Sequence, residues 1–309
     1  MKNHILVIGG TGYIGSEVVY QLKKNPDICV TSFSRHINEN CTSFAGSMAS
    51  LSDLENVFSQ NSITITIILG GFKSIGDSQC VPLYANNEIV GLINILNTCV
   101  KYKCKKILFL SSSAVYESGS SISESDSISA KSFYAFIKHT SESLIRWYHK
   151  YQYLDYVILR CFNVCGINSL QEKSDDIISL SFARDSVEIY GHDFNTLDGT
   201  LIRDYVHVKD VGNAILQAIN YEKSEIFNIG SGIGYSILEI LKIIEESKVQ
   251  KIEKFFSSRR EYDQDCLVAD ITKAETELKW HPHYKLNDII EEEKLYFDNK
   301  NDDKKNKEK

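Results

Sequence analysis

The sequence lacks an apolar run long enough to cross a membrane. A spanning helix needs about 20 consecutive apolar residues, whereas Ile63 to Leu69, one of the longest runs, is short and interrupted by threonine. A secretory leader is not expected either, because Met1 to His4 lead directly into the apolar segment Ile5 to Ile8 and then into glycines. We therefore expect a cytoplasmic protein without a membrane partner.

An excess of positive charge is also missing. The 309 residues carry a formal net charge of −7, which argues against nucleic acid as a partner. A hydrophobic content of 43% and a charged content of 24% are ordinary for a soluble globular protein. The length suits one large or two ordinary domains.

Cysteine pairs with metal-ligand spacing are missing as well. The eight cysteines are scattered without a C-x-x-C pattern, and Cys161 and Cys165, four apart, have no suitable neighbours. We interpret the cysteines as reduced, mostly buried thiols, and we expect no metal.

What is present begins with a glycine-rich segment between a strand-like run, Ile5 to Ile8, and a helix-like stretch to about Lys24. Glycines there allow a tight turn and a close approach of the backbone to a pyrophosphate. The helix N-terminus supplies free amides for the phosphates. This pattern predicts a dinucleotide site, with Gly9, Thr11, Gly12, Tyr13, Ile14 and Gly15 as the binding residues.

No acidic residue follows the second predicted strand, Ile28 to Phe33. An NAD-binding protein usually places Asp or Glu there for the adenosine ribose, whereas Arg favours the 2′-phosphate of NADP. The chain has Ser34, Arg35 and His36 instead. Arg35 is therefore a candidate cofactor ligand, with a solvated basic turn as the alternative, and both NAD and NADP remain open.

Apolar runs alternate with helical patterns along the first half of the chain. The runs are Ile63 to Leu69, Ile107 to Leu110 and Tyr156 to Leu159, and the helical patterns are Leu51 to Phe58, Asn87 to Lys101 and Phe133 to Tyr148. This alternation predicts an α/β fold with a Rossmann-type, doubly wound parallel sheet.

Tyr134 and Lys138 would stand one turn apart on one face of the last of these helices. A neighbouring ammonium favours the phenolate form of tyrosine, so Tyr134 could work as a base. Active-site residues in such sheets lie at the carboxyl ends of strands, and Ser111-Ser112-Ser113 follow the run Lys106 to Leu110. An exposed tyrosine–lysine face and a polar serine loop are the simpler alternatives.

Together these pieces resemble the extended short-chain dehydrogenase/reductase superfamily, and the second half is similar to the nucleotide-sugar epimerases, above all the UDP-glucose 4-epimerases. The resemblance runs from Ile5 to about Trp280, and its most specific motif is D-G-T-x-x-R-D-Y-x-H-V-x-D at Asp198 to Asp210. Other matching segments are Gly71 to Ser78, Leu159 to Asn163, Asn228 to Ser236 and Arg259 to Asp263.

The resemblance implies roles for individual residues. It assigns catalysis to Ser112 (with Ser113 as the alternative), Tyr134 and Lys138, and cofactor contacts also to Lys73 and Asn87. It assigns the substrate to Lys73, Ser112, Tyr134, Asn163, Tyr190, Arg203, Arg260 and Asp263. Arg203 and Arg260 would grip the UDP diphosphate and Asp263 the uridine ribose, which suits guanidinium forks and a carboxylate.

The activity implied is NAD(P)-dependent 4-epimerisation of a UDP-hexose, either UDP-glucose/UDP-galactose or the N-acetyl pair, through a 4-keto sugar. An NADP-dependent 4-ketoreductase or a dehydratase is the alternative, although Ser113-Ala114 stand where related dehydratases carry Asp-Glu. A nucleotide-sensing binding protein is less expected, because the Ser, Tyr and Lys are all present. The chain departs from the family at Gly46-Ser47-Met48, in the adenine contact, and at Asp175-Asp176, where an Asn pair is usual.

We expect a dinucleotide-binding domain over residues 1–166 with a returning segment at 204–228. Residues 167–203 and 229–297 would form a smaller, discontinuous α/β substrate domain. Residues 298–309 contain no apolar side chain and are expected to be a disordered tail. The family commonly forms homodimers through two helices that match Asn87 to Lys101 and Phe133 to Tyr148, although these helices could equally be buried within one subunit.

Overall fold

The protein is built around a parallel sheet of seven strands, in the order β11-β7-β5-β4-β1-β2-β3. The structure, a computed structural model, describes residues 3–71, 81, 85–170 and 172–307. The strands are β1 (Asn3–Ile8), β2 (Ile28–Ser34), β3 (Thr42–Ala45), β4 (Ile65–Ile68), β5 (Lys106–Ser112), β7 (Asp155–Cys161) and β11 (Glu225–Ile229). Every neighbouring pair is parallel, which confirms the predicted fold class.

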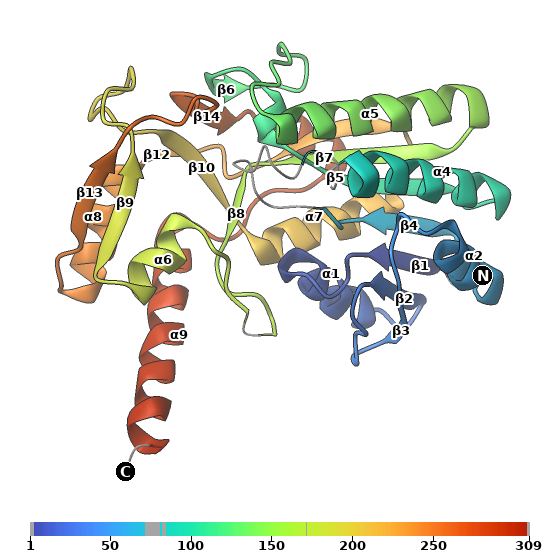
Figure 1. Cartoon of the computed structure of the whole chain (residues 1–309), viewed down its shortest axis with the longest axis horizontal. Helices are drawn as coiled ribbons and strands as arrows, with labels where there is room; N and C mark the ends of the chain where they lie inside the picture. Colours follow the sequence, from blue (N-terminus) through green and yellow to red (C-terminus); the bar gives the residue numbers. More distant parts are fainter. Residues whose placement is uncertain (1–2, 72–80, 82–84, 171, 308–309) are drawn as a thin grey trace.

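Helices cover both faces of this sheet, because successive side chains of a buried strand point to opposite sides. In β1, Ile5 and Val7 join the apolar core beneath α1 (Tyr13–Lys23) and α7 (Val208–Asn220). Leu6 and Ile8 join a second core beneath α2 (Leu51–Gln60), α4 (Gly91–Lys101) and α5 (Phe133–Gln152). Figure 1 shows these two helical layers on either side of the sheet.

A smaller α/β part lies beside the carboxyl ends of the large sheet (Figure 1). Its mixed sheet contains β12 (Gly234–Ser236), β10 (Ile202–His207), β14 (Cys266–Ala269), β6 (Gly119–Ile122) and β8 (Asn163–Cys165). A two-stranded sheet pairs β9 (Ser186–Tyr190) with β13 (Glu253–Ser257), and the helices are α6 (Ile177–Ala183), α8 (Ile237–Lys248) and α9 (Leu286–Lys307). The chain thus leaves the large sheet after β5 for β6, returns for α5 and β7, leaves again, and returns once more for α7 and β11 before its last part. The domain boundaries at residues 166, 204 and 228 stay a prediction.

The C-terminal segment is drawn as a helix. Helix α9 continues to Lys307, and the disordered tail expected over residues 298–309 stays a prediction. The first turns of α9 are fixed by the buried side chains of Leu286, Ile289 and Ile290. Once these turns exist, each further residue adds a helical hydrogen bond while fixing only itself, and Lys and Glu are good helix formers. Figure 1 shows this end of the helix projecting away from the rest of the molecule.

Across the described ranges 3–71, 85–170 and 172–307, no helix is both long enough and apolar enough to cross a membrane.

Candidate active site

A cavity of about 430 Å³ opens where the carboxyl ends of β1, β2, β4 and β5 meet. The strand order places β1 beside both β2 and β4, so the loops that follow these strands converge. The predicted residues that line this cavity are Gly9, Thr11, Gly12, Tyr13, Ile14, Gly15, Arg35, Asn87, Tyr134 and Lys138. The structure therefore brings together, in one hollow, all of the predicted cofactor residues that it describes. Lys73 lies outside the described residues.

The glycine loop fits the backbone of a dinucleotide. Gly9 has a φ of +86°, and a Cβ there would lie 2.6 Å from the Gly70 amide nitrogen. A Cβ on Gly15 would lie 2.0 Å from the carbonyl oxygen of Gly9. Both positions therefore exclude a side chain. Gly12 is the N-cap of α1 and supplies no side-chain cap, so the first amides of this helix are available to phosphate oxygens.

The adenosine end of the cavity carries positive rather than negative side chains. This end is lined by Ser34, the last residue of β2, and by Arg35 and His36, which follow it. Both Arg35 and His36 are exposed. The Ser34 hydroxyl accepts a hydrogen bond from the Thr11 amide at 3.3 Å, which ties the end of β2 to the glycine loop. A ribose at this point would meet a hydroxyl and two bases where the usual NAD site offers a carboxylate.

Tyr134 and Lys138 lie in the first two turns of α5, which Ser132 caps by accepting a hydrogen bond from the Ala135 amide. The Lys138 Nζ lies 5.8 Å from the centre of the Tyr134 ring. It donates a hydrogen bond to the Leu110 carbonyl at 3.2 Å, near the end of β5. The two side chains therefore stand together at the strand end, as the i, i+4 spacing predicts.

Ser112 sits at the carboxyl end of β5, but it is not among the residues that line the cavity. Its Oγ accepts a hydrogen bond from the Ala114 amide at 3.2 Å and so caps the turn Ser113–Val115. Because a hydroxyl both accepts and donates, this bond leaves the Ser112 proton available to a ligand. Ser113 is buried, whereas Ser111 lines the cavity.

The predicted UDP ligands form a second cluster in the smaller part. Arg260 donates to both carboxylate oxygens of Asp263, at 2.8 and 3.1 Å. The Arg203 guanidinium lies 3.9 Å from the same carboxylate. The Arg260 guanidinium stacks over the Tyr190 ring, 4.5 Å from its centre. Four predicted substrate residues therefore share one cluster, in which two guanidiniums meet one carboxylate.

Burial and charge act in opposite directions on these arginines. Arg203 is only 9% exposed, and this burial lowers its pKa, with the Asp263 carboxylate opposing the change. Burial also acts to lower the pKa of Arg260, but the hydrogen bonds to Asp263 raise it on balance. Asn163 lies on β8, where it is the register partner of Tyr205 on β10.

Sequence reasoning missed a buried polar network behind the serines. Glu142 accepts hydrogen bonds from the Ser111 hydroxyl at 2.5 Å and from the Arg160 guanidinium at 3.0 and 2.7 Å. Arg160 also donates to the Tyr116 hydroxyl at 2.7 Å, and burial raises the pKa of Tyr116 to about 12. The sequence contained a signal for Glu142, because this residue lies four positions beyond Lys138 and therefore on the same face of the helix.

A second missed residue is Glu88, a buried carboxylate that lines the cavity. Its Oε2 lies 4.0 Å from the Lys138 Nζ. No feature of the sequence around Asn87 distinguishes this glutamate from a solvated one, so only the folded chain reveals it.

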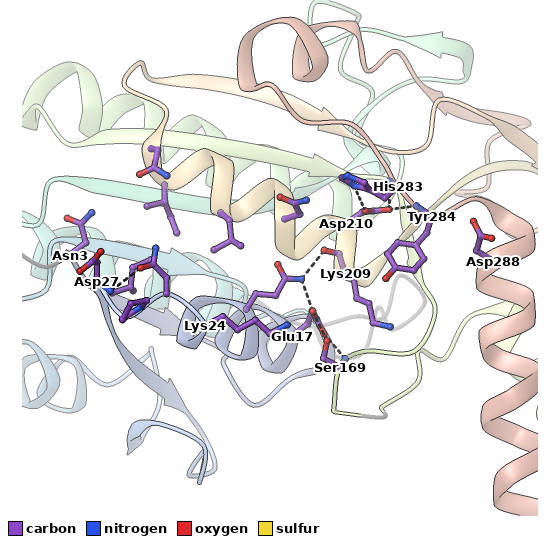
Figure 2. A pocket seen from close by; sticks show the side chains of 18 residues that line it. Asn3, Glu17, Lys24, Asp27, Ser169, Lys209, Asp210, His283, Tyr284 and Asp288 are labelled. Carbon is purple, nitrogen blue, oxygen red and sulfur yellow. Dashed lines mark hydrogen bonds and ion pairs between the residues drawn. The ribbon is translucent and has the colours of Figure 1, made fainter.

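A larger hollow of about 1420 Å³ lies elsewhere, between α1, α7 and the segment 281–288. None of the predicted site residues lines it. Figure 2 shows that the carboxylates of Glu17 and Asp210 already have partners: Glu17 accepts from Gln21 and from the Ser169 amide, at 2.6 Å each, and Asp210 accepts from the amides of His283 and Tyr284. We therefore place the active site in the smaller cavity.

Within the described parts of the chain, no group of three or more His, Cys, Asp or Glu side chains is arranged to hold a metal ion.

A glycine loop opening a doubly wound sheet, with a tyrosine and a lysine at the end of a central strand, defines a Rossmann-type dinucleotide-binding enzyme. The family described as "NAD dependent epimerase/dehydratase family" matches residues 5–230. The chain belongs to this family.

Relatives resemble the chain over nearly its whole length. A UDP-glucose 4-epimerase from Lacticaseibacillus casei is 33% identical over 312 residues, covering 93% of this chain and 94% of the relative. One from Lactobacillus helveticus is 31% identical, with 93% and 94% covered. The crystal structure of UDP-glucose 4-epimerase from Bifidobacterium longum in complex with NAD+ and UDP superposes with a TM-score of 0.88 at 27% identity. It covers 97% of this chain and 99% of that one.

Proposed function

We propose that this protein is an NAD-dependent isomerase that interconverts UDP-hexoses at C4, either UDP-glucose and UDP-galactose or their N-acetyl counterparts. The observation that carries the proposal is the convergence of Tyr134 and Lys138 on the cavity that also holds the glycine loop. The cluster around Asp263 supplies the complementary grip for a nucleoside diphosphate. The names of the relatives at about 30% identity support the same substrate class.

A nicotinamide cofactor held by the glycine loop, Tyr134 and Lys138 would supply reversible hydride exchange with the sugar C4, which is chemistry that side chains do not provide. Tyr134 takes the O4 proton as C4 is oxidised to a ketone and gives it back when the ketone is reduced. Lys138 places its side-chain amine beside the phenol, 5.8 Å from the centre of the Tyr134 ring. Ser112 donates its free proton to the sugar oxygen, and Asn87 and Lys73 contact the cofactor.

The rest of the substrate is held at its nucleotide end. Arg203 and Arg260 bind the diphosphate, because planar guanidiniums match phosphate oxygens. Asp263 turns to the uridine ribose and Tyr190 to the uracil, and the resemblance assigns Lys73 and Asn163 to the sugar. These contacts leave the hexose less tightly held than UDP, so the 4-keto sugar can turn over and receive the hydride on its other face.

The decisive test replaces the proposed base. Tyr134→Phe should lower the epimerisation rate at least 100-fold, because positioned acid–base catalysis contributes about 10²–10⁴-fold. Tyr153→Phe, which is 88% exposed just beyond the end of the same helix, should leave the rate unchanged. The assay supplies UDP-galactose, UDP-GalNAc or their gluco epimers without added cofactor and follows the product by chromatography. A Tyr134→Phe variant with near-normal turnover would refute the mechanism.

A second candidate function is an NADP-dependent 4-ketoreductase, favoured by Arg35 and His36 at the adenosine end of the cavity. A reductase would consume NADPH in proportion to the product formed, whereas an epimerase consumes none. Following the reduced cofactor during the same assay separates the two functions.

We also infer a homodimer formed through α4 and α5. A row of large side chains along α5 supports it: Phe136 and Trp147 are each 54% exposed and Tyr151 is 51% exposed. Apolar surface of this size on one helix is typical of an interface. Light scattering should give twice the 35.1 kDa of one chain.

A cytoplasmic location is a further inference, supported by the free thiols of the described cysteines.

A further inference from the structure

Glu88 occupies an unusual place for a carboxylate. It lies in the π-helical turn Ala85–Val90, which leads into α4. Such turns insert an extra residue into a helix and are frequent at functional sites. Glu88 is 6% exposed, yet it lines the proposed cofactor cavity. Among the described residues that line this cavity, it is the only one with a carboxylate.

The carboxylate has close neighbours on two sides. Its Oε2 lies 4.0 Å from the Lys138 Nζ, and both side chains are nearly inaccessible, at 5% and 8% exposure. On the other side it packs against Gly71, where an added Cβ would lie 2.8 Å from the same oxygen. Burying a carboxylate is costly unless a charge or hydrogen bonds compensate for it. The chain therefore maintains this ion pair inside its cofactor site.

We propose that Glu88 tunes the redox balance of the bound nicotinamide by offsetting the charge of Lys138. The inference rests on the proposed function, which puts the nicotinamide beside Tyr134 and Lys138. The oxidised ring carries one positive charge and the reduced ring is neutral. Lys138 alone would therefore favour the reduced form. The Glu88 carboxylate cancels part of this field and holds the cofactor toward its oxidised form.

This balance matters for an epimerase because the hydride must return to the sugar. A cofactor that is reduced too readily would retain the hydride, which is the former C4 hydrogen, after the keto sugar has left. Glu88 would therefore act through Lys138 as a positioning charge, without touching the substrate.

The test compares the affinities for NAD+ and NADH in the full-length protein. The protein is equilibrated with an excess of both cofactors at set ratios, free cofactor is removed by rapid gel filtration, and the bound ratio is measured by chromatography. Glu88→Gln should shift the preference toward NADH about tenfold, the scale of one charge acting over several ångströms in a partly buried site. For a two-electron couple, this is about 30 mV more positive.

Two controls make the comparison specific. Glu55→Gln removes a carboxylate that pairs with Lys101 on the surface of α2 and should leave the ratio unchanged. Lys138→Met should shift the preference toward NAD+, and adding Glu88→Gln to it should bring the ratio back toward that of the wild type. If Glu88→Gln alone does not fold, the comparison of Lys138→Met with the double variant still tests whether Glu88 affects the cofactor ratio.

A ratio that Glu88→Gln leaves within twofold of the wild type, or moves toward NAD+, would overturn the inference. So would an unchanged ratio on adding Glu88→Gln to Lys138→Met. The readout needs no sugar. An absence of epimerase activity in the wild type would therefore reject the proposed function, whereas an unchanged ratio in an active epimerase would reject only the role of Glu88.

Discussion

Arg35 stands at the mouth of the cavity as an exposed cation for which the described residues provide no ion-pair partner. A 2′-phosphate on the adenosine ribose would place its charge where Arg35 and His36 can reach it. We expect Arg35→Ala to weaken NADP binding about fivefold, because a charge-assisted bond at an exposed site contributes roughly 1 kcal/mol. Binding of NAD should change less than twofold. Isothermal titration of each cofactor measures both effects.

Arg184→Ala, at the end of α6 and away from the cavity, is the matched control. If Arg35→Ala weakened NAD and NADP equally, Arg35 would have no role in reading the 2′-phosphate.

Residues whose roles follow from local sequence were the ones that could be predicted. Gly9 and Gly15 must be glycines because other backbone atoms lie where their Cβ atoms would be. The spacing of the glycines in the sequence alone indicates such close packing. Tyr134 and Lys138 meet because one helix carries both. The direction of the Ser112 hydroxyl depends on the Ala114 amide of the following turn. The burial of Glu88 depends on Lys138, fifty residues away along the chain, so neither could be read from the sequence.

At the scale of elements, the network around Glu142 joins three of them. Glu142 lies on α5, Ser111 ends β5, and Arg160 lies on β7 directly opposite Ser111 in the sheet. This junction fixes the helix that carries Tyr134 against the strand ends. Glu142 is fully buried and Arg160 is 3% exposed.

We therefore expect Glu142→Gln to lower the free energy of unfolding by about 3 kcal/mol, because removing one partner of a buried ion pair leaves the other uncompensated. Glu55→Gln, which breaks the exposed pair with Lys101, should cost less than about 1 kcal/mol. Chemical denaturation of the two variants gives the comparison. Equal losses would show that the network contributes no more than a surface pair.

The elements of the large sheet were predictable because each is a continuous apolar run bounded by turn residues. The run Ile5 to Ile8 forms most of β1, and Lys106 to Leu110 forms most of β5. The mixed sheet was not predictable to this degree. It pairs β6, at residues 119–122, with β14, at residues 266–269, and such distant pairing leaves no local pattern. For the end of α9, composition alone predicts disorder and does not show that buried side chains fix the first turns of this helix.

For the molecule as a whole, we expect the free energy of unfolding to depend on pH through one buried carboxyl group in the smaller part, that of Glu293. Glu293 on α9 is fully buried and accepts a hydrogen bond from the Ser179 hydroxyl of α6 at 2.6 Å. Its Oε2 has no hydrogen-bond partner among the described residues. Burial raises the pKa of Glu293 from 4.5 to about 7, and the nearby Asp176 carboxylate adds to the rise.

The sign follows from the two states. Between pH 4.5 and pH 7, the unfolded chain has released this proton and the folded chain still holds it, so stability falls as the pH rises. Above pH 7, Glu293 is ionised in both the folded and the unfolded chain, and stability falls no further with pH on its account. Glu293→Gln removes this titration. Relative to the wild type, the variant should therefore gain stability between pH 5 and pH 8, by up to about 3 kcal/mol.

Chemical denaturation of wild type and variant at both pH values measures this difference, and groups common to the two proteins cancel. Glu246→Gln, on the exposed side of α8, should show no such gain. If Glu293→Gln kept a constant offset from the wild type at both pH values, the carboxylate of Glu293 would already be ionised in the folded protein at pH 5. The contact between α6 and α9 would then carry a buried charge instead of a buried proton.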